Sequence, residues 1–120
     1  MKIEVGMLCR MNDGAILKVD NISKDETGWY VISLGGVNMH TPSAEVIGVK
    51  SASFNIIDLI EVGDVIEFMV INDKWDKGII GIPDEEFLKK LHEDDKIKIL
   101  KIVTKEQFKS AEFEVDNSGN

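Results

Sequence analysis

Apolar side chains recur at every second position from Val5 to Met11, which is the period of a strand with one buried face. A turn signal, Asn-Asp-Gly, follows at residues 12–14 and predicts a hairpin. Gly35 and Gly36 break the third apolar run. The strands predicted for this half cover residues 5–11, 15–22, 29–34 and 44–49. Four short strands with frequent turns favour a small barrel of the SH3 type.

The second half mixes strands with short helices. Pro83 and the acidic residues after it form a helix-start signal, and apolar spacing carries this helix to about His92. Thr104 and Gln107 have the spacing of a capping box, which predicts a helix over 105–110. The predicted strands cover residues 65–71, 78–82, 97–103 and 111–115, with a polar loop over 72–78. The chain is therefore expected to be all-β or β-rich α+β: one or two small SH3-like barrels with one or two short helices.

The pattern also suggests how the chain divides. We expect an N-terminal β-barrel module over 1–52, a C-terminal β module with short helices over 53–116, and a disordered tail over 117–120. The tetrapeptide Ile-Glu-Val-Gly occurs at 3–6 and again at 60–63, each time before a predicted strand. Such a match arises by chance at glycine turns or marks a repeat of two small β modules, and the sequence leaves both readings open.

Composition and charge narrow the setting. The chain has 120 residues, 43% of them hydrophobic, one cysteine and a net charge of -8. A single cysteine excludes an intrachain disulfide, and no apolar run approaches the length of a membrane span, so a cytoplasmic location is expected. Residues 53–120 carry sixteen acidic against nine basic residues. This excess makes binding to duplex nucleic acid unfavourable.

The candidate catalytic groups do not form a recognisable set. Cys9 has no paired histidine and lies on an apolar strand face, which favours a buried structural thiol. His40, placed in a loop, and His92 have no metal-ligand spacing around them. The central acids are read as the solvated edge of a strand or turn: Asp58, Glu61 and Asp64. We therefore expect no enzyme activity, no cofactor and no metal.

Two features are candidates for binding a partner. The first is Trp75 in a charged loop, since exposed aromatic side chains often anchor interfaces; the alternative is that Trp75 plugs a barrel end. The second is the acidic start of the predicted helix, which could steer a basic partner, or which merely solubilises the helix. The candidate partner-binding residues are Asp73, Trp75, Asp76, Asp84, Glu85 and Glu86.

Three blocks of the sequence resemble a family of small proteins encoded by phages and prophages of Gram-positive bacteria. The opening block has the pattern I-x-V-G-x-x-x-R at residues 3–10. The central block reads NIIDLIEVGD at 55–64, and the closing block begins IVTKEQF at 102–108. Between Glu67 and Lys98 no family pattern is found. The resemblance implies a phage or prophage origin and two small β elements joined by the central block, and it carries over no catalytic or binding residues.

These observations lead to one functional expectation and two alternatives. The protein is expected to be a non-catalytic protein-binding protein that occupies the surface of a host or phage protein. Its sharpest form is an inhibitor of a host defence nuclease of the CRISPR type. The alternatives are a small nucleic-acid-binding barrel in phage gene regulation and an accessory structural or assembly protein of the phage particle.

Overall fold

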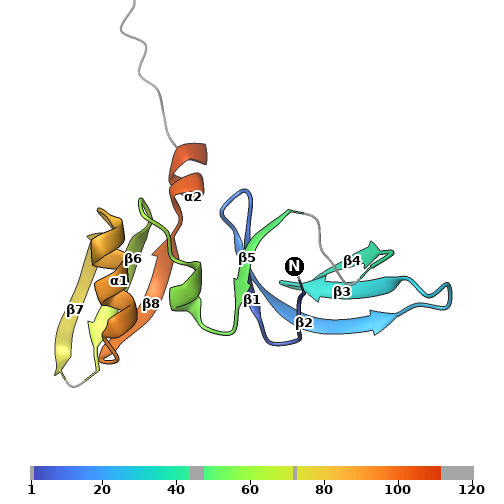
Figure 1. Cartoon of the computed structure of the whole chain (residues 1–120), viewed down its shortest axis with the longest axis horizontal. Coiled ribbons are helices and arrows are strands. Elements are labelled where there is room, and N and C mark those ends of the chain that lie inside the picture. The colour runs from blue at the N-terminus through green and yellow to red at the C-terminus, as the bar shows by residue number, and fades with distance from the viewer. Residues whose placement is uncertain (1, 44–47, 72, 112–120) are drawn as a thin grey trace, which may run out of the picture.

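The computed structural model describes residues 2–43, 48–71 and 73–111, with the side chains of 73–76 outside the description. The chain forms two antiparallel sheets that lie side by side (Figure 1). The first sheet has the order β4-β3-β2-β1-β5 and the second the order β7-β6-β8. The first sheet comprises β1 (Leu8–Met11), β2 (Ile16–Lys24), β3 (Tyr30–Leu34), β4 (Val37–Thr41) and β5 (Val49–Ser53). The remaining elements are η1 (Ile56–Leu59), β6 (Val65–Val70), β7 (Asp73–Gly81), α1 (Glu85–Glu93), β8 (Ile97–Val103) and α2 (Lys105–Ser110).

The β-rich α+β class with two short α-helices is confirmed, but the barrels are not closed. A barrel closes only when its first and last strands pair. Among the described residues, β4 and β5 remain the two edges of the first sheet, and β7 and β8 those of the second. The protein therefore consists of two open sheets. The division at residue 52 into independent domains stays a prediction.

Several predicted boundaries change in the structure. Gly35 and Gly36, with φ of +56° and +85°, do not end the sheet but make a two-residue hairpin that pairs Leu34 with Val37. His40 therefore lies in strand β4, not in a loop. The predicted loop 72–78 is also wrong, because β7 begins at Asp73 and pairs with β6. Two predicted strands, at 44–49 and 111–115, fall largely outside the described residues, because the description leaves out 44–47 and 112–115.

The helices and their caps follow the sequence signals. The Asp84 side chain accepts the Phe87 N–H at 2.8 Å and caps α1. Thr104 and Gln107 form the predicted capping box of α2. No helix in the described parts of the chain is long and apolar enough to cross a membrane.

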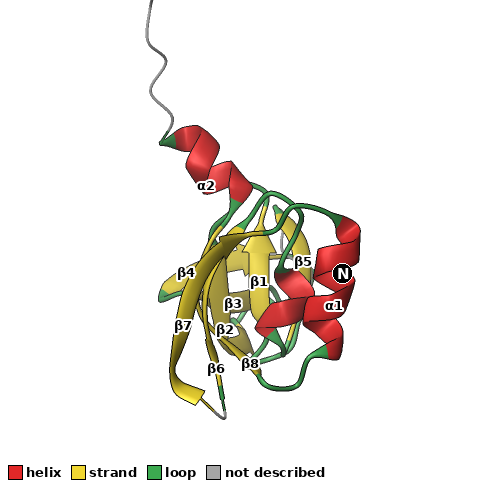
Figure 2. Cartoon of the chain, turned by 90° about the vertical axis from the view of Figure 1, so that its left-hand side faces the viewer, coloured by secondary structure: helices red, strands yellow, loops and turns green. Residues whose placement is uncertain are grey.

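Each sheet has its own hydrophobic cluster. In the first half, buried side chains from β1, β2 and β3 gather around Cys9. In the second half, Ile66 of β6 lies at the centre and α1 covers one face of the sheet through Phe87, Leu88 and Leu91 (Figure 2). The buried members are Ile3, Cys9, Val19, Ile32 and Leu34 in the first cluster, and Ile60, Ile66, Ile82 and Leu91 in the second. Apolar burial thus stabilises each half separately.

The repeated Ile-Glu-Val-Gly segment folds into the same turn twice. Ile3 and Ile60 are each 3% exposed, and Gly6 and Gly63 have φ of +92° and +97°, a region that favours glycine. Each copy makes the same three backbone hydrogen bonds, written here from N–H to carbonyl. In the first copy they run from Gly6 to Val19, from Met7 to Glu4 and from Val19 to Met7. In the second copy they run from Gly63 to Ile82, from Asp64 to Glu61 and from Ile82 to Asp64. The echo in the sequence is therefore a structural repeat at the entrance to each sheet.

Candidate functional site

The one arginine of the chain lies at the meeting point of the two halves. Arg10 comes from β1, and its side chain is 0% exposed. Its Nη1 and Nη2 donate to the two carboxylate oxygens of Asp64 at 2.5 and 2.9 Å. Nη1 also donates to the carbonyl of Leu59 at 2.9 Å, and Nη2 to Glu106 at 2.6 Å. This two-pronged geometry is the strongest form of arginine–carboxylate pairing.

Acidic and basic groups around Arg10 balance each other. Glu61 lies 3.2 Å from Arg10 Nε and also pairs with Lys105 at 2.9 Å. Lys50 bridges Glu61 and Glu106 at 2.8 and 3.0 Å. We call these six residues the junction cluster: Arg10, Lys50, Glu61, Asp64, Lys105 and Glu106. Three positive and three negative charges make the cluster neutral, and the buried charges of Arg10 and Asp64 are paired with each other, which offsets the cost of their burial.

Three hydrogen bonds to the backbone fix the cluster and the start of α2 in place. Asp64 accepts the N–H of Glu61 at 2.7 Å and that of Lys105 at 2.9 Å. Thr104 is fully buried, and its hydroxyl donates to the Gly14 carbonyl at 2.9 Å. The start of α2 is therefore bonded both to the turn before β6 and to the β1–β2 hairpin of the first sheet.

The pKa shifts of Glu106, Glu61 and Arg10 all favour their charged forms. Burial alone would raise the pKa of Glu106, but hydrogen bonds from Lys50, its own backbone N–H and Arg10 lower it to about 2. Burial opposes ionisation at Glu61 too, yet Lys50 and Lys105 lower its pKa. Burial would lower the pKa of Arg10, while the hydrogen bonds that Arg10 donates to Asp64 and Glu106 raise it. Such groups hold ion pairs and are poorly suited to exchanging protons near pH 7.

The sequence reading of the acidic block was wrong for Asp64. A solvated acidic edge was expected, whereas this carboxylate is 0% exposed. Its partner lies 54 positions earlier in the chain, and no local pattern reveals so distant a pair. One signal was present: Arg10 is the chain's single arginine and follows the buried Cys9.

The predicted partner-binding residues lie in two places. Asp73, Trp75 and Asp76 are on β7, and their side chains are outside the described residues. Asp84 caps α1, with Glu85 and Glu86 exposed in its first turn. The structure therefore gives Asp84 a capping role, and a role of these residues in binding a partner stays a prediction.

The other candidate groups are separated from one another. Cys9 is buried as expected, and burial raises the pKa of its thiol. In the first half, His40 Nδ1 lies 3.6 Å from Asp25 Oδ2. In the second half, His92 Nδ1 lies 3.7 Å from Asp58 Oδ1. Within the residues that the structure describes, no group of three or more histidine, cysteine or acidic side chains could hold a metal ion.

The second sheet carries a further surface on the side away from α1. Residues directly opposite in an antiparallel pair point to the same face, and the register of β7, β6 and β8 arranges nine of them in three rows. We call this surface the outer face. Its rows are Gly81–Val65–Val103, Ile79–Glu67–Lys101 and Lys77–Met69–Lys98.

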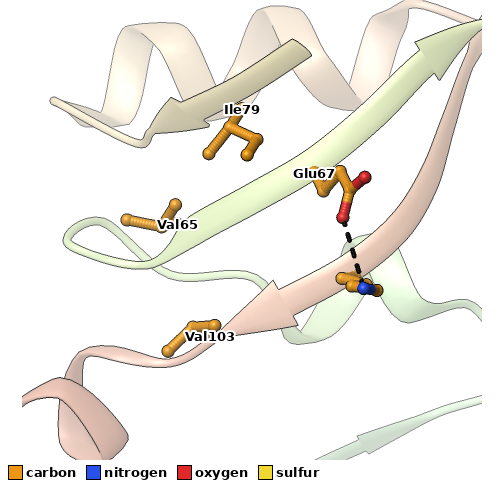
Figure 3. Close-up of a pocket in the computed structure, with 5 residues that line it drawn as sticks. Val65, Glu67, Ile79 and Val103 are labelled. Atoms are coloured by element: carbon orange, nitrogen blue, oxygen red, sulfur yellow. Dashed lines mark ion pairs between the residues drawn. The ribbon is translucent and has the colours of Figure 1, made fainter. Parts of the chain in front are cut away.

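A shallow hollow of about 110 Å³ lies on the outer face. Val65, Ile79 and Val103 supply apolar walls, and Glu67 and Lys101 pair at 3.8 Å along one side (Figure 3). Ile79 is 74% exposed and Val103 is 41% exposed. β-Branched side chains are thus held open to solvent on a regular sheet, where contiguous apolar surface often marks a binding site.

Comparisons with known proteins give no relative: no family model matches the chain, and neither a curated protein nor a solved structure does.

Proposed function

We propose that the chain is a non-catalytic protein-binding protein and that the outer face of the second sheet is its contact surface. The observation that carries this proposal is the exposure of Ile79 and Val103, beside the half-buried Val65, around one hollow. The buried core of an interface is more apolar than its rim, and a few side chains near its centre supply most of the binding energy. The charged groups of the junction cluster, by contrast, are occupied by one another and link the two halves.

The phage or prophage setting and the inhibition of a host defence nuclease are the narrower form of this proposal. The resemblance of the three sequence blocks supports the setting, and inhibition is proposed by association with it. A small protein that binds a nuclease surface needs no active site of its own. The same surface would also serve a phage assembly protein.

Binding to nucleic acid is the second candidate, and one observation favours it. Lys77, Lys98 and Lys101 lie on the outer face of a chain whose net charge is -8. Lysines on an open sheet can contact a phosphate backbone. The excess of acids elsewhere opposes this, so protein binding remains the stronger candidate.

A matched pair of variants tests the proposal. Ile79→Asp places a charge on the outer face, while Val37→Asp makes the same change at an exposed position of β4, 65% accessible. Tagged proteins are used to capture partners from a Gram-positive bacterial lysate, and a captured protein is purified and titrated by calorimetry. Ile79→Asp should weaken this binding at least tenfold and Val37→Asp should leave it unchanged. Equal affinity of both variants for the purified partner would exclude the outer face.

The narrower form has its own assay. A purified CRISPR nuclease is incubated with its guide and target DNA in the presence of wild-type protein or the Ile79→Asp variant. Inhibition by the wild type and its loss in the variant would support the defence-inhibitor form. Undiminished cleavage across a panel of such nucleases would contradict this form while leaving protein binding intact.

A further inference from the structure

We infer that the outer face recognises an extended protein segment that carries an apolar side chain and, four residues away, a carboxylate. This inference rests on the proposed function and adds the chemistry of the partner.

The apolar end of the outer face is the first row together with Ile79. Gly81 has no side chain beside Val65, and a Cβ placed there would find its nearest neighbours at 3.9 Å. The hollow lined by Val65, Ile79 and Val103 is therefore open above the sheet. An aliphatic side chain from a partner can enter it and remove the three walls from water.

The basic end is the third row. Lys77 and Lys98 stand on either side of Met69, because both pair with it in the register. Lys101 in the second row has its own partner, Glu67, at 3.8 Å. Three lysines against one glutamate give the outer face a local excess of positive charge within a chain of net charge -8. A carboxylate is therefore favoured over Met69, between the two ammonium groups.

The spacing of the rows sets the pattern in the partner. Neighbouring rows are two residues apart along β6 and β7, while a bulge in β8 leaves Lys101 and Lys98 three positions apart. On the central strand β6 the first and third rows are therefore separated by about 13 Å. In an extended partner segment, residues i and i+4 face the same side and are separated by about the same distance. An apolar residue over the hollow thus places residue i+4 over the third row. A lysine at position i+4 would be repelled there by the ammonium groups of Lys77 and Lys98.

Charge also disfavours a second copy of this chain as the occupant. Two molecules of net charge -8 repel each other, and two outer faces would bring their lysine rows together. A partner strand packed face to face on the sheet avoids both costs, at the sheet separation of about 10 Å that natural sandwiches use.

The test uses three labelled probes and the full-length protein. The first probe is a nine-residue serine–threonine peptide with leucine at its third position and glutamate at its seventh. The second has lysine in place of that glutamate, and the third is a single-stranded oligothymidine of eight nucleotides. Fluorescence anisotropy should show the tightest binding for the glutamate peptide, weakening as salt is raised.

Reversing the charge of the two lysines in the third row gives the decisive comparison. Lys77→Glu/Lys98→Glu should lower affinity for the glutamate peptide about tenfold and should make the lysine peptide the better ligand. The control is Lys89→Glu/Lys90→Glu, which makes the same change in charge on α1 and should leave the preference as in the wild type. Circular dichroism confirms that each variant is folded.

The outcomes separate this inference from the proposed function. If Ile79→Asp abolishes binding of the captured partner but the charge reversal changes neither its affinity nor the peptide preference, the outer face binds protein and the acidic pattern is wrong. Tighter binding of the oligothymidine than of either peptide overturns the inference in favour of nucleic acid. Dimerisation in sedimentation velocity that Ile79→Asp abolishes overturns it in favour of a second copy.

Discussion

Arg10 of the first sheet and Asp64 before the second sheet form a buried, two-pronged ion pair, with N–O distances of 2.5 and 2.9 Å. Each half has its own apolar cluster, and this pair, its charged neighbours and the hydrogen bond from Thr104 to Gly14 connect the two halves. Asp64 stands at the position that Met7 occupies in the first copy of the repeated turn, and both side chains accept an N–H from the residue three positions earlier. The second turn thus has an aspartate where the first has a methionine, and this aspartate provides the carboxylate that binds Arg10 of the first sheet.

Removing Arg10 should be far more damaging than replacing the pair. Arg10→Ala leaves Asp64 buried without its partner, and we expect a loss of about 3–5 kcal/mol in the free energy of unfolding. Arg10→Met/Asp64→Leu removes both charges and should recover much of that loss. Urea denaturation measures both variants.

The control for this experiment is an exposed pair. Lys90 lies 3.6 Å from Glu86 on the surface of α1, so Lys90→Ala should change the free energy of unfolding by less than about 1 kcal/mol. Equal losses from Arg10→Ala and Lys90→Ala would show that the buried pair does not hold the fold together.

Acid should weaken the junction cluster through Glu106. Its pKa falls from 4.5 to about 2 on folding, chiefly because hydrogen bonds from Lys50, its own backbone N–H and Arg10 outweigh the effect of burial. A depressed folded-state pKa contributes stability above pH 4.5 that is lost as pH falls towards 2. With solvent reaching part of the side chain, this contribution is at most about 2 kcal/mol.

The variant Glu106→Gln isolates that contribution. Its free energy of unfolding should depend less steeply on pH between about 5 and 2 than that of the wild type, while the difference between the two proteins should be largest above pH 5. Urea titrations at a series of pH values provide the comparison. Parallel pH profiles for the two proteins would mean that Glu106 is not stabilised as an anion.

Gly14 should tolerate no side chain. Its φ is +89°, and an added Cβ would overlap the Thr104 hydroxyl and lie 2.8 Å from Glu106 Cβ. Gly28 has a similar φ of +87° with nothing within 4 Å of its Cβ position. Gly28→Ala therefore reports the backbone strain alone, about 1 kcal/mol, and Gly14→Ala should cost at least twice as much. An equal drop in melting temperature for the two variants would contradict the close contact between the β1–β2 hairpin and α2.

The features that sequence predicted well are local ones. The capping box at Thr104 and Gln107 and the helix capped by Asp84 depend on neighbours within four residues, and both were found. For the repeated tetrapeptide the sequence left chance and a repeat both open, and the structure shows the same turn twice, each copy with a buried isoleucine and a glycine of positive φ. Strand β4 was missed because two glycines were read as an end, whereas positive φ at both makes a tight hairpin.

The features that sequence missed depend on distant partners. Asp64 looks like any surface acid until the fold brings Arg10 to it. Ile79 lies in a run that predicts a strand, but its exposure follows only from which side α1 covers. Barrel closure likewise depends on whether edge strands meet, which alternation along one strand does not specify. The outer face and the junction cluster therefore became visible only in three dimensions.

Cys9 offers a direct measure of how the first sheet opens. Its side chain is 0% exposed in the first hydrophobic cluster, and burial raises its pKa, so both access and thiolate formation oppose modification. N-ethylmaleimide labelling, followed by mass spectrometry, should be slow in the native protein and reach the rate of a free thiol in concentrated urea. Cys9 precedes Arg10 on β1, so Arg10→Ala should accelerate labelling by loosening this strand, whereas Lys90→Ala should not. Rapid labelling of the wild type under native conditions would show that β1 opens readily, and the junction cluster could then not be what holds the two halves together.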